Sequence, residues 1–121
     1  SGLDWSAVRL IGDAAGPAAL LGYDPCGWLA PTDAASDPAG AAAEILLRAP
    51  EARWVYLALP VLLAGGRKLV APLLQAGRRI DAWTLEGVDD DTPRLIERLF
   101  DLGVEQVTTD DPAGVLALET A

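Results

Sequence analysis

The side chains that could do chemistry in this sequence of 121 residues are mostly carboxylates, and no histidine accompanies them. Without histidine the chain has no Ser-His or Cys-His nucleophilic pair, no imidazole general base and no His-ligated metal site. Cys26 is the single cysteine, which excludes an intrachain disulfide and a thiolate cage for a metal. We interpret Cys26 as inert, and we expect no catalytic residue and no metal ligand from this chain itself.

Three local groups of residues still allow a functional interpretation. Asp89-Asp90-Asp91 could supply hard oxygen ligands to a metal, but acids before Thr92-Pro93 more often complement a helix dipole, which we favour. Asp110 could accept backbone N–H groups at the strand end or cap the last helix with Asp111, and we favour the capping role over a catalytic carboxylate. Gly65-Gly66-Arg67-Lys68 could bind a phosphate group through backbone N–H groups and two cationic side chains at a helix start. We favour the interpretation that it is an ordinary helix start.

The composition excludes some partners. The net charge of −9 and a pI near 4.2 make nucleic acids and anionic membranes poor partners, because like charges repel. No apolar stretch approaches the roughly 20 residues that cross a bilayer; the best, 57–64, is short and contains Pro60. We therefore expect no membrane insertion. Asp4 and Arg9 interrupt any signal-peptide pattern, and the compartment stays open, with the cytoplasm as our expectation.

The chain divides into a part that is hard to predict, 1–49, and a regular part, 50–121. In the first part we expect a helix over 3–14, a strand within 18–23, a proline-containing loop over 28–40 and a helix over 41–49. In the second part β-branched and aromatic residues predict strands, and apolar residues at helical spacing predict helices. The expected strands are 54–59, 79–85 and 104–109, and the expected helices are 67–76, 94–102 and 112–118.

The regular part repeats itself. When Lys68 is aligned with Arg94, a displacement of 26 residues, Leu73 matches Leu99 and Gly77 matches Gly103. A strand follows each glycine, so the repeated unit is helix–Gly–strand, and such a period indicates repeated architecture. Helices that alternate with short strands predict parallel strands joined by right-handed crossovers. The period fits a barrel unit, at about 31 residues per unit, and it also fits an open sheet.

Two segments point to a family. The first segment ends at 83–86, Trp-Thr-Leu-Glu; the second runs from 102–105, Leu-Gly-Val-Glu, to 109–112, Thr-Asp-Asp-Pro. This pair resembles the C-terminal end of the glycerophosphodiester phosphodiesterase family, whose typical pattern is Trp-Thr-Val-Asn, then Leu-Gly-Val-Asp and Thr-Asp-x-Pro. The resemblance covers about 50–121. Glu86 stands where the family has Asn, and Glu105 stands where Asp is common, so the polarity of the loop after Leu85 differs.

The resemblance implies an α/β fold, namely the C-terminal portion of a (β/α)8 TIM barrel with parallel strands alternating with helices. It also implies that the parent enzyme hydrolyses glycerophosphodiesters to an alcohol and glycerol 3-phosphate with a divalent metal, Mg²⁺ or Ca²⁺. The catalytic histidines and the metal-binding acids of that family lie in the first half of its barrel, and this chain has no counterpart of them. We therefore expect the chain alone to be inactive and to hold no cofactor.

Trp83 is the one residue that we assign to substrate binding. Alternation along 79–85 places Asp81, Trp83 and Leu85 on one face of the strand and Ile80, Ala82 and Thr84 on the other. The first set would face the barrel interior with Trp83 near its open end, where ligands bind, and the resemblance likewise implies a place beside the substrate. The alternative is that Trp83 only fills the top layer of the core.

A second hypothesis belongs to a different class of protein. The chain could be a non-catalytic α/β binding or assembly module: either a half barrel that self-associates through exposed strand edges, or a small open α/β domain with Trp83 near its groove. The barrel interpretation requires the strands that end at Leu59, Leu85 and Thr109 to lie side by side and parallel, as a slice of a closed ring. Antiparallel strands, or a self-contained sheet with no place for missing neighbours, would contradict it.

Overall fold

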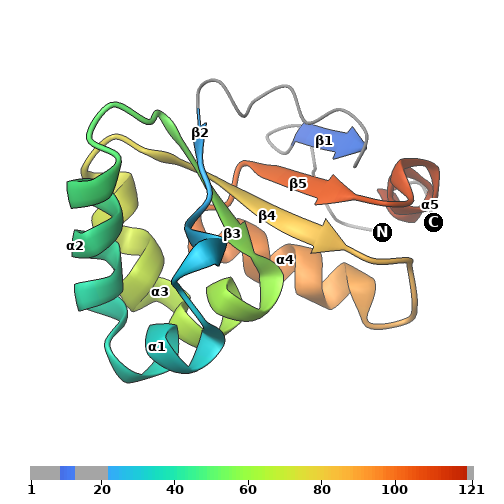
Figure 1. Cartoon of the computed structure of the whole chain (residues 1–121). Coiled ribbons are helices and arrows are strands. Elements are labelled where there is room, and N and C mark those ends of the chain that lie inside the picture. Colours follow the sequence, from blue (N-terminus) through green and yellow to red (C-terminus); the bar gives the residue numbers. More distant parts are fainter. Residues whose placement is uncertain (1–8, 13–21, 120–121) are drawn as a thin grey trace.

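The computed structural model of this chain describes residues 9–12 and 22–119. Its five strands form one parallel sheet in the order β1-β5-β4-β3-β2 (Figure 1). The strands are β1 (Arg9–Gly12), β2 (Gly22–Tyr23), β3 (Trp54–Ala58), β4 (Arg79–Leu85) and β5 (Gln106–Thr109). The predicted α/β class is confirmed, and the three strands of the regular part do lie side by side and parallel.

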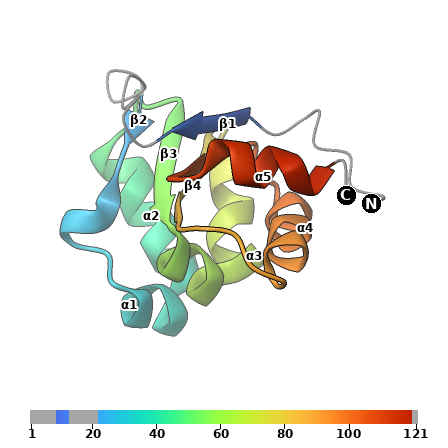
Figure 2. The same cartoon turned by 90° about the vertical axis from the view of Figure 1, so that its right-hand side faces the viewer.

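Helices follow the strands and cover one face of the sheet. The helical elements are η3 (Pro25–Gly27), α1 (Pro31–Ser36), α2 (Pro38–Arg48), α3 (Leu59–Gln75), α4 (Thr92–Leu102) and α5 (Pro112–Glu119). Figures 1 and 2 show α2, α3 and α4 on the same side of the sheet, whereas α5 lies near the carboxyl ends of the strands and contacts β1. In the described part of the chain no α-helix covers the other side of the sheet, which we call the helix-free face.

The hydrophobic core fills the space between the sheet and these helices. Alternate strand residues point into it, as a pleated strand requires, and they meet the apolar stripes of α3 and α4. The buried strand residues are Val55, Leu57, Ile80, Ala82 and Val107, and the buried helix residues include Leu69, Leu73, Ile96 and Leu99.

The repeat deduced from the sequence has a matching geometry at the two helix ends. Gly77 and Gly103 both have positive φ, 81° and 98°. The amide after each glycine donates to the carbonyl five residues earlier: Arg78 N to Leu73 O and Val104 N to Leu99 O, both at 3.0 Å. Both helices thus end in a glycine-capped turn that satisfies their last carbonyls and redirects the chain into the next strand.

Helix α3 differs from its predicted bounds. It begins at Leu59, directly after β3, although we expected the strand to reach 59 and the helix to begin only at 67. Pro60 is compatible with this start because proline is favoured in the first helical turn, where its missing N–H has no partner to lose. Gly66, with φ 58° and ψ −146°, breaks the helix, so its second part does begin at Arg67 as predicted. Pro72 lies inside this part without ending it.

The predictions for the first 49 residues need two corrections. Residues 9–12 form β1, not part of a helix over 3–14, and the rest of that segment lies outside the described residues. The predicted loop over 28–40 contains α1 and the start of α2, because Pro31 and Pro38 occupy first helical positions. Asp37 caps α2 by accepting the Gly40 N–H at 3.0 Å. Of the strand expected within 18–23, the structure describes only Gly22 and Tyr23, which form β2.

Strand β1 pairs with β5 and not with β2. From β2 to β5 the strands follow one another in chain order, and the first strand then lies beside the last. Only β2 to β5 therefore keep the sequential order expected of successive β/α units. No helix in the described part of the chain is long and apolar enough to span a bilayer.

Candidate functional site

The helix-free face carries polar and aromatic side chains where the opposite face carries aliphatic ones. In β3, β4 and β5 the residues that alternate with the core positions are Trp54, Tyr56, Asp81, Trp83, Gln106 and Thr108. The strand register aligns Tyr56 with Asp81 and Asp81 with Gln106, so these three side chains form a row across the sheet. Leu85, which we predicted on this face, belongs to the hydrophobic core instead, because the pairing of β4 with β5 shifts register between Ala82 and Leu85.

Asp81 is the centre of a hydrogen-bonded network on this face. Its carboxylate is fully buried and accepts Gln106 Nε2 at 2.6 Å. Thr108 Oγ1 donates to the same carboxylate, 3.0 and 3.1 Å from its two oxygens. Burial raises the pKa of Asp81 to about 6; the bonds from Gln106 and Thr108 oppose this shift, and the negative charge of Asp24 adds to it. Asp81 can therefore hold or release a proton near neutral pH.

Two further polar atoms on this face are buried without a partner. Among the described residues nothing hydrogen-bonds Tyr56 Oη or Trp83 Nε1. Burial and the nearby charge of Asp81 also raise the pKa of Tyr56, which keeps its hydroxyl protonated. An unsatisfied buried donor is unfavourable and calls for an explanation, and a ligand that supplies an acceptor is one.

Trp83 lies where the sequence placed it. It is half-buried on the helix-free face, one layer nearer the carboxyl end of β4 than Asp81. Ala58, at the end of β3, is its partner in the strand register. Its position suits contact with a ligand at the carboxyl edge of the sheet, and its role in binding stays a prediction.

The loops at that edge are joined by Asp110. Its Oδ1 accepts the Gly87 N–H at 2.7 Å, which ties the loop after β4 to the end of β5. The neighbouring Asp111 caps α5 by accepting the Gly114 N–H at 2.9 Å. The capping role that we favoured for Asp110 is therefore wrong: Asp110 accepts a backbone N–H from the adjacent loop, and Asp111 alone caps the helix.

Replacing Asp110 by alanine should loosen this edge. We expect a loss of about 0.5–1.5 kcal/mol in the free energy of unfolding, the scale of one hydrogen bond, and faster hydrogen exchange at the Gly87 amide. Asp110→Asn keeps an acceptor oxygen and should lose less. Equal losses for the two variants, with unchanged exchange at Gly87, would show that the bond does not order the loop.

The other chemical groups from the sequence have structural roles. Asp89 Oδ1 accepts the Asp91 N–H at 2.8 Å, so the three acids form a turn before α4. In the described ranges, 9–12 and 22–119, no three metal-ligating side chains gather. Arg67 Nη2 donates to Asp101 O at 3.2 Å and joins α3 to α4. Cys26 is exposed, and the negative charge of Asp24 raises the pKa of its thiol.

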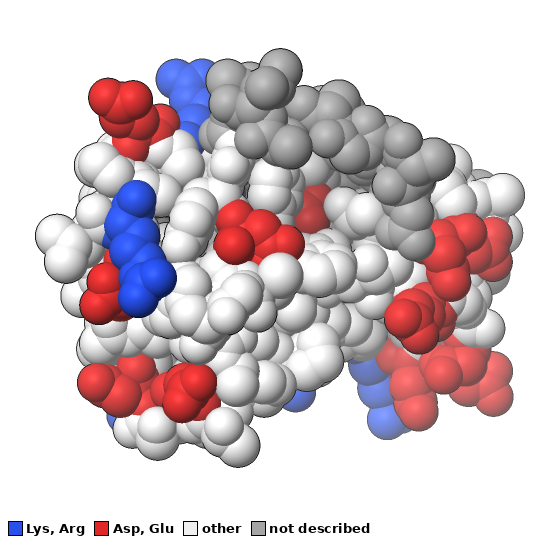
Figure 3. Space-filling model, in the orientation of Figure 1, with Lys and Arg blue, Asp and Glu red and all other residues white. Residues whose placement is uncertain are grey.

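The surface around the carboxyl edge is negatively charged. Figure 3 shows acidic side chains gathered at the edge where Figure 1 places the loop between β4 and α4. An anionic ligand would be repelled there unless a cation accompanied it.

Fold and site together define a parallel α/β unit with a polar, partly aromatic helix-free face. No protein-family model, no curated protein and no solved structure matches the chain.

Proposed function

We propose that this chain forms the C-terminal β/α units of a TIM barrel similar to glycerophosphodiester phosphodiesterases, with its helix-free face as the barrel lining. The observation that carries this proposal is the sequential order β2-β3-β4-β5, in which each strand lies beside the one that follows it in the chain, as in a barrel. Strand β1 does not follow this order, because successive barrel units would place it beside β2 and not beside β5.

Three further observations support the proposal. Helices α2, α3 and α4 all cover the same face, as in the outer layer of a barrel. The two segments of the family resemblance end adjacent strands, β4 and β5, at the edge where barrel enzymes bind ligands. The bond between Gly87 and Asp110 joins the loops that follow those strands.

The complete barrel would hydrolyse glycerophosphodiesters to an alcohol and glycerol 3-phosphate. Such a cleavage needs a proton donor for the leaving alkoxide and a divalent cation, Mg²⁺ or Ca²⁺, over the phosphate oxygens. This chain has no histidine, and both requirements would be met by the other half of the barrel. What this half contributes is binding: Trp83 borders the substrate, and its unpaired Nε1 donates to a ligand oxygen.

Ligand binding tests the contribution of this half. We expect glycerol 3-phosphate with Mg²⁺ to change the tryptophan fluorescence of the purified chain saturably, and Trp83→Phe to weaken binding about three- to tenfold, the scale of one lost hydrogen bond. Trp28→Phe, on another part of the surface, is the control and should bind normally. Absence of saturable binding, or equal weakening by both variants, would reject this role for Trp83.

An activity assay tests whether the catalytic residues lie in the other half of the proposed barrel. The purified chain should not hydrolyse glycerophosphocholine with either Mg²⁺ or Ca²⁺, because it has no histidine and its described residues form no cluster of metal ligands. Metal-dependent release of glycerol 3-phosphate would contradict the assignment of catalysis to the other half.

The second candidate function is a non-catalytic binding or assembly module. The observation that favours it is the edge position of β2, which pairs only with β3 within the described residues. An open edge of a parallel sheet can pair with another chain. A concentration-dependent dimer in sedimentation experiments, without any binding of glycerol 3-phosphate, would favour this module over the barrel.

A further inference from the structure

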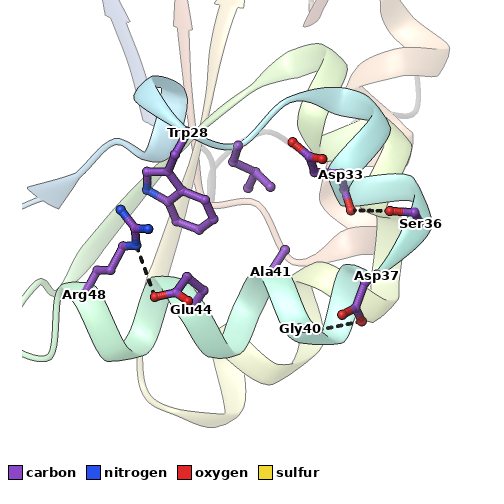
Figure 4. A pocket seen from close by; sticks show the side chains of 9 residues that line it. Trp28, Asp33, Ser36, Asp37, Gly40, Ala41, Glu44 and Arg48 are labelled. Atoms are coloured by element: carbon purple, nitrogen blue, oxygen red, sulfur yellow. Dashed lines mark hydrogen bonds and ion pairs between the residues drawn. The ribbon is translucent and has the colours of Figure 1, made fainter.

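A groove of about 460 Å³ lies away from the helix-free face, between α1, α2 and the segment that joins η3 to α1. Figure 4 shows the ring of Trp28 above α2, with Asp33 and Ser36 on α1 across from it. The floor is apolar and consists of Leu29 and Ala41, both buried. The groove is thus open to solvent, with an apolar base and an indole ring along one side.

The rim of the groove has three carboxylates, and each has an oxygen to spare. Asp33 Oδ2 accepts the Ala30 N–H, Asp37 Oδ1 accepts the Gly40 N–H, and Glu44 Oε2 pairs with Arg48. The second oxygen of each carboxylate has no hydrogen bond or ion pair within the described part of the chain. Since carboxylates only accept hydrogen bonds, the rim is complementary to a ligand with several donors and positive charge.

A cationic side chain of the protein itself, Arg48, already lies in the groove. The guanidinium of Arg48 lies 4.4 Å from the centre of the Trp28 ring, and its Nε is 3.1 Å from Glu44 Oε2. About half of the Arg48 side chain is exposed, so it can leave by rotating toward solvent. This contact demonstrates that the ring and the carboxylate together accommodate an organic cation, and it leaves Asp33 and Asp37 without one.

The charges along α2 have a regular spacing. Asp37, Ala41 and Glu44 follow one face of the helix at intervals of four and three residues, so the two carboxylates lie about 10 Å apart along the axis, with the apolar Ala41 between them. A long aliphatic chain with an ammonium group at each end matches this pattern. We propose that the groove binds a linear aliphatic polyamine, with one ammonium group at Glu44, another at Asp37 and Asp33, and its methylene chain over Leu29 and Ala41.

Calorimetric titration with spermidine tests the proposal. In about 0.1 M salt, where exposed charges more than about 10 Å apart are screened, we expect one saturable site. Glu44→Gln should weaken binding about three- to tenfold, the scale of one ion pair with a charged ligand. The matched control is Glu97→Gln, which makes the same charge change on the exposed surface of α4 and should bind like the wild type.

Two further measurements separate the groove from general attraction by an acidic protein. Butylamine, which has one ammonium group, should bind at least tenfold more weakly than spermidine. Arg48→Gln removes the internal competitor and should tighten spermidine binding several-fold. The proposal is wrong if spermidine shows no saturable binding, if Glu97→Gln weakens it as much as Glu44→Gln, or if Arg48→Gln weakens it.

Discussion

Replacing Asp81 by asparagine should stabilise this protein at neutral pH by about 2–3 kcal/mol. The buried carboxyl has its pKa raised to about 6, from an ordinary value of 3.8, chiefly by desolvation. Holding the ionised form in the fold is therefore unfavourable, by about 1.4 kcal/mol for each unit of pKa. Asparagine removes the charge, and its amide can still bond the side chains of Gln106 and Thr108, which now hold the carboxylate.

The pH dependence has a definite sign. Because the folded-state pKa of Asp81 is the higher one, the folded protein binds this proton more tightly than the unfolded chain does. Below about pH 4 Asp81 is protonated in the folded protein and does not lower its stability. The free-energy cost of ionising Asp81 in the fold grows between pH 4 and 6 and is complete above pH 6. The difference in unfolding free energy between Asp81→Asn and wild type should thus rise from near zero at pH 4 to its full value at pH 7.5.

Urea unfolding of both proteins across this range measures that difference. Asp101→Asn, on the exposed surface of α4, makes the same change of charge outside the network and serves as the control. A difference for Asp81→Asn that does not vary with pH, or a destabilised variant at pH 7.5, would refute the buried, proton-holding carboxyl.

Replacing Gly103 by alanine should be the more damaging of two equivalent cap substitutions. Gly77 and Gly103 hold corresponding positions of the repeat, and both have positive φ, which is unfavourable for alanine by about 1–2 kcal/mol. A Cβ at Gly77 would meet nothing within 4 Å, whereas one at Gly103 would come within 2.4 Å of Leu74 Cδ1. We expect about 1 kcal/mol of destabilisation for Gly77→Ala and about 2–3 kcal/mol for Gly103→Ala.

Thermal and urea unfolding of the two variants measure this comparison. Gly103→Ala combined with Leu74→Ala removes the colliding side chain, so the extra loss at Gly103 should disappear relative to Leu74→Ala alone. Equal losses for the two single variants would mean that Leu74 moves aside freely and that only the backbone conformation matters.

Local signals account for the part of the fold that the sequence predicted. The pairs Leu73 with Gly77 and Leu99 with Gly103 indicated where two helices end, and the structure forms the same cap at both. The prolines of the first part misled the prediction, because we took them as a sign of a loop. Pro31 and Pro38 instead occupy the first positions of helices, where proline is favoured. No local signal could place β1 beside β5, since their pairing joins opposite ends of the chain.

The candidate site divides in the same way. Alternation along one strand placed Asp81 and Trp83 on the same face, and the structure agrees. The partners of Asp81, namely Gln106 and Thr108, come from another strand, so the network depends on the register of β4 with β5. The pattern of one strand cannot reveal that register, and it gave no reason to select Tyr56, whose hydroxyl becomes buried only in the folded sheet.

The neighbouring positions of β1 and β5 have a consequence for synthesis of the chain. Strands β2 to β5 can be added one after another as each leaves the ribosome, because each pairs with the strand made just before it. Of these five strands β1 is made first, and its partner β5 is made last. Their contact closes the longest loop between paired strands in the described part of the chain and so belongs to the slow, final stage of forming this sheet. Until then β1 is an unpaired segment that a chaperone could hold.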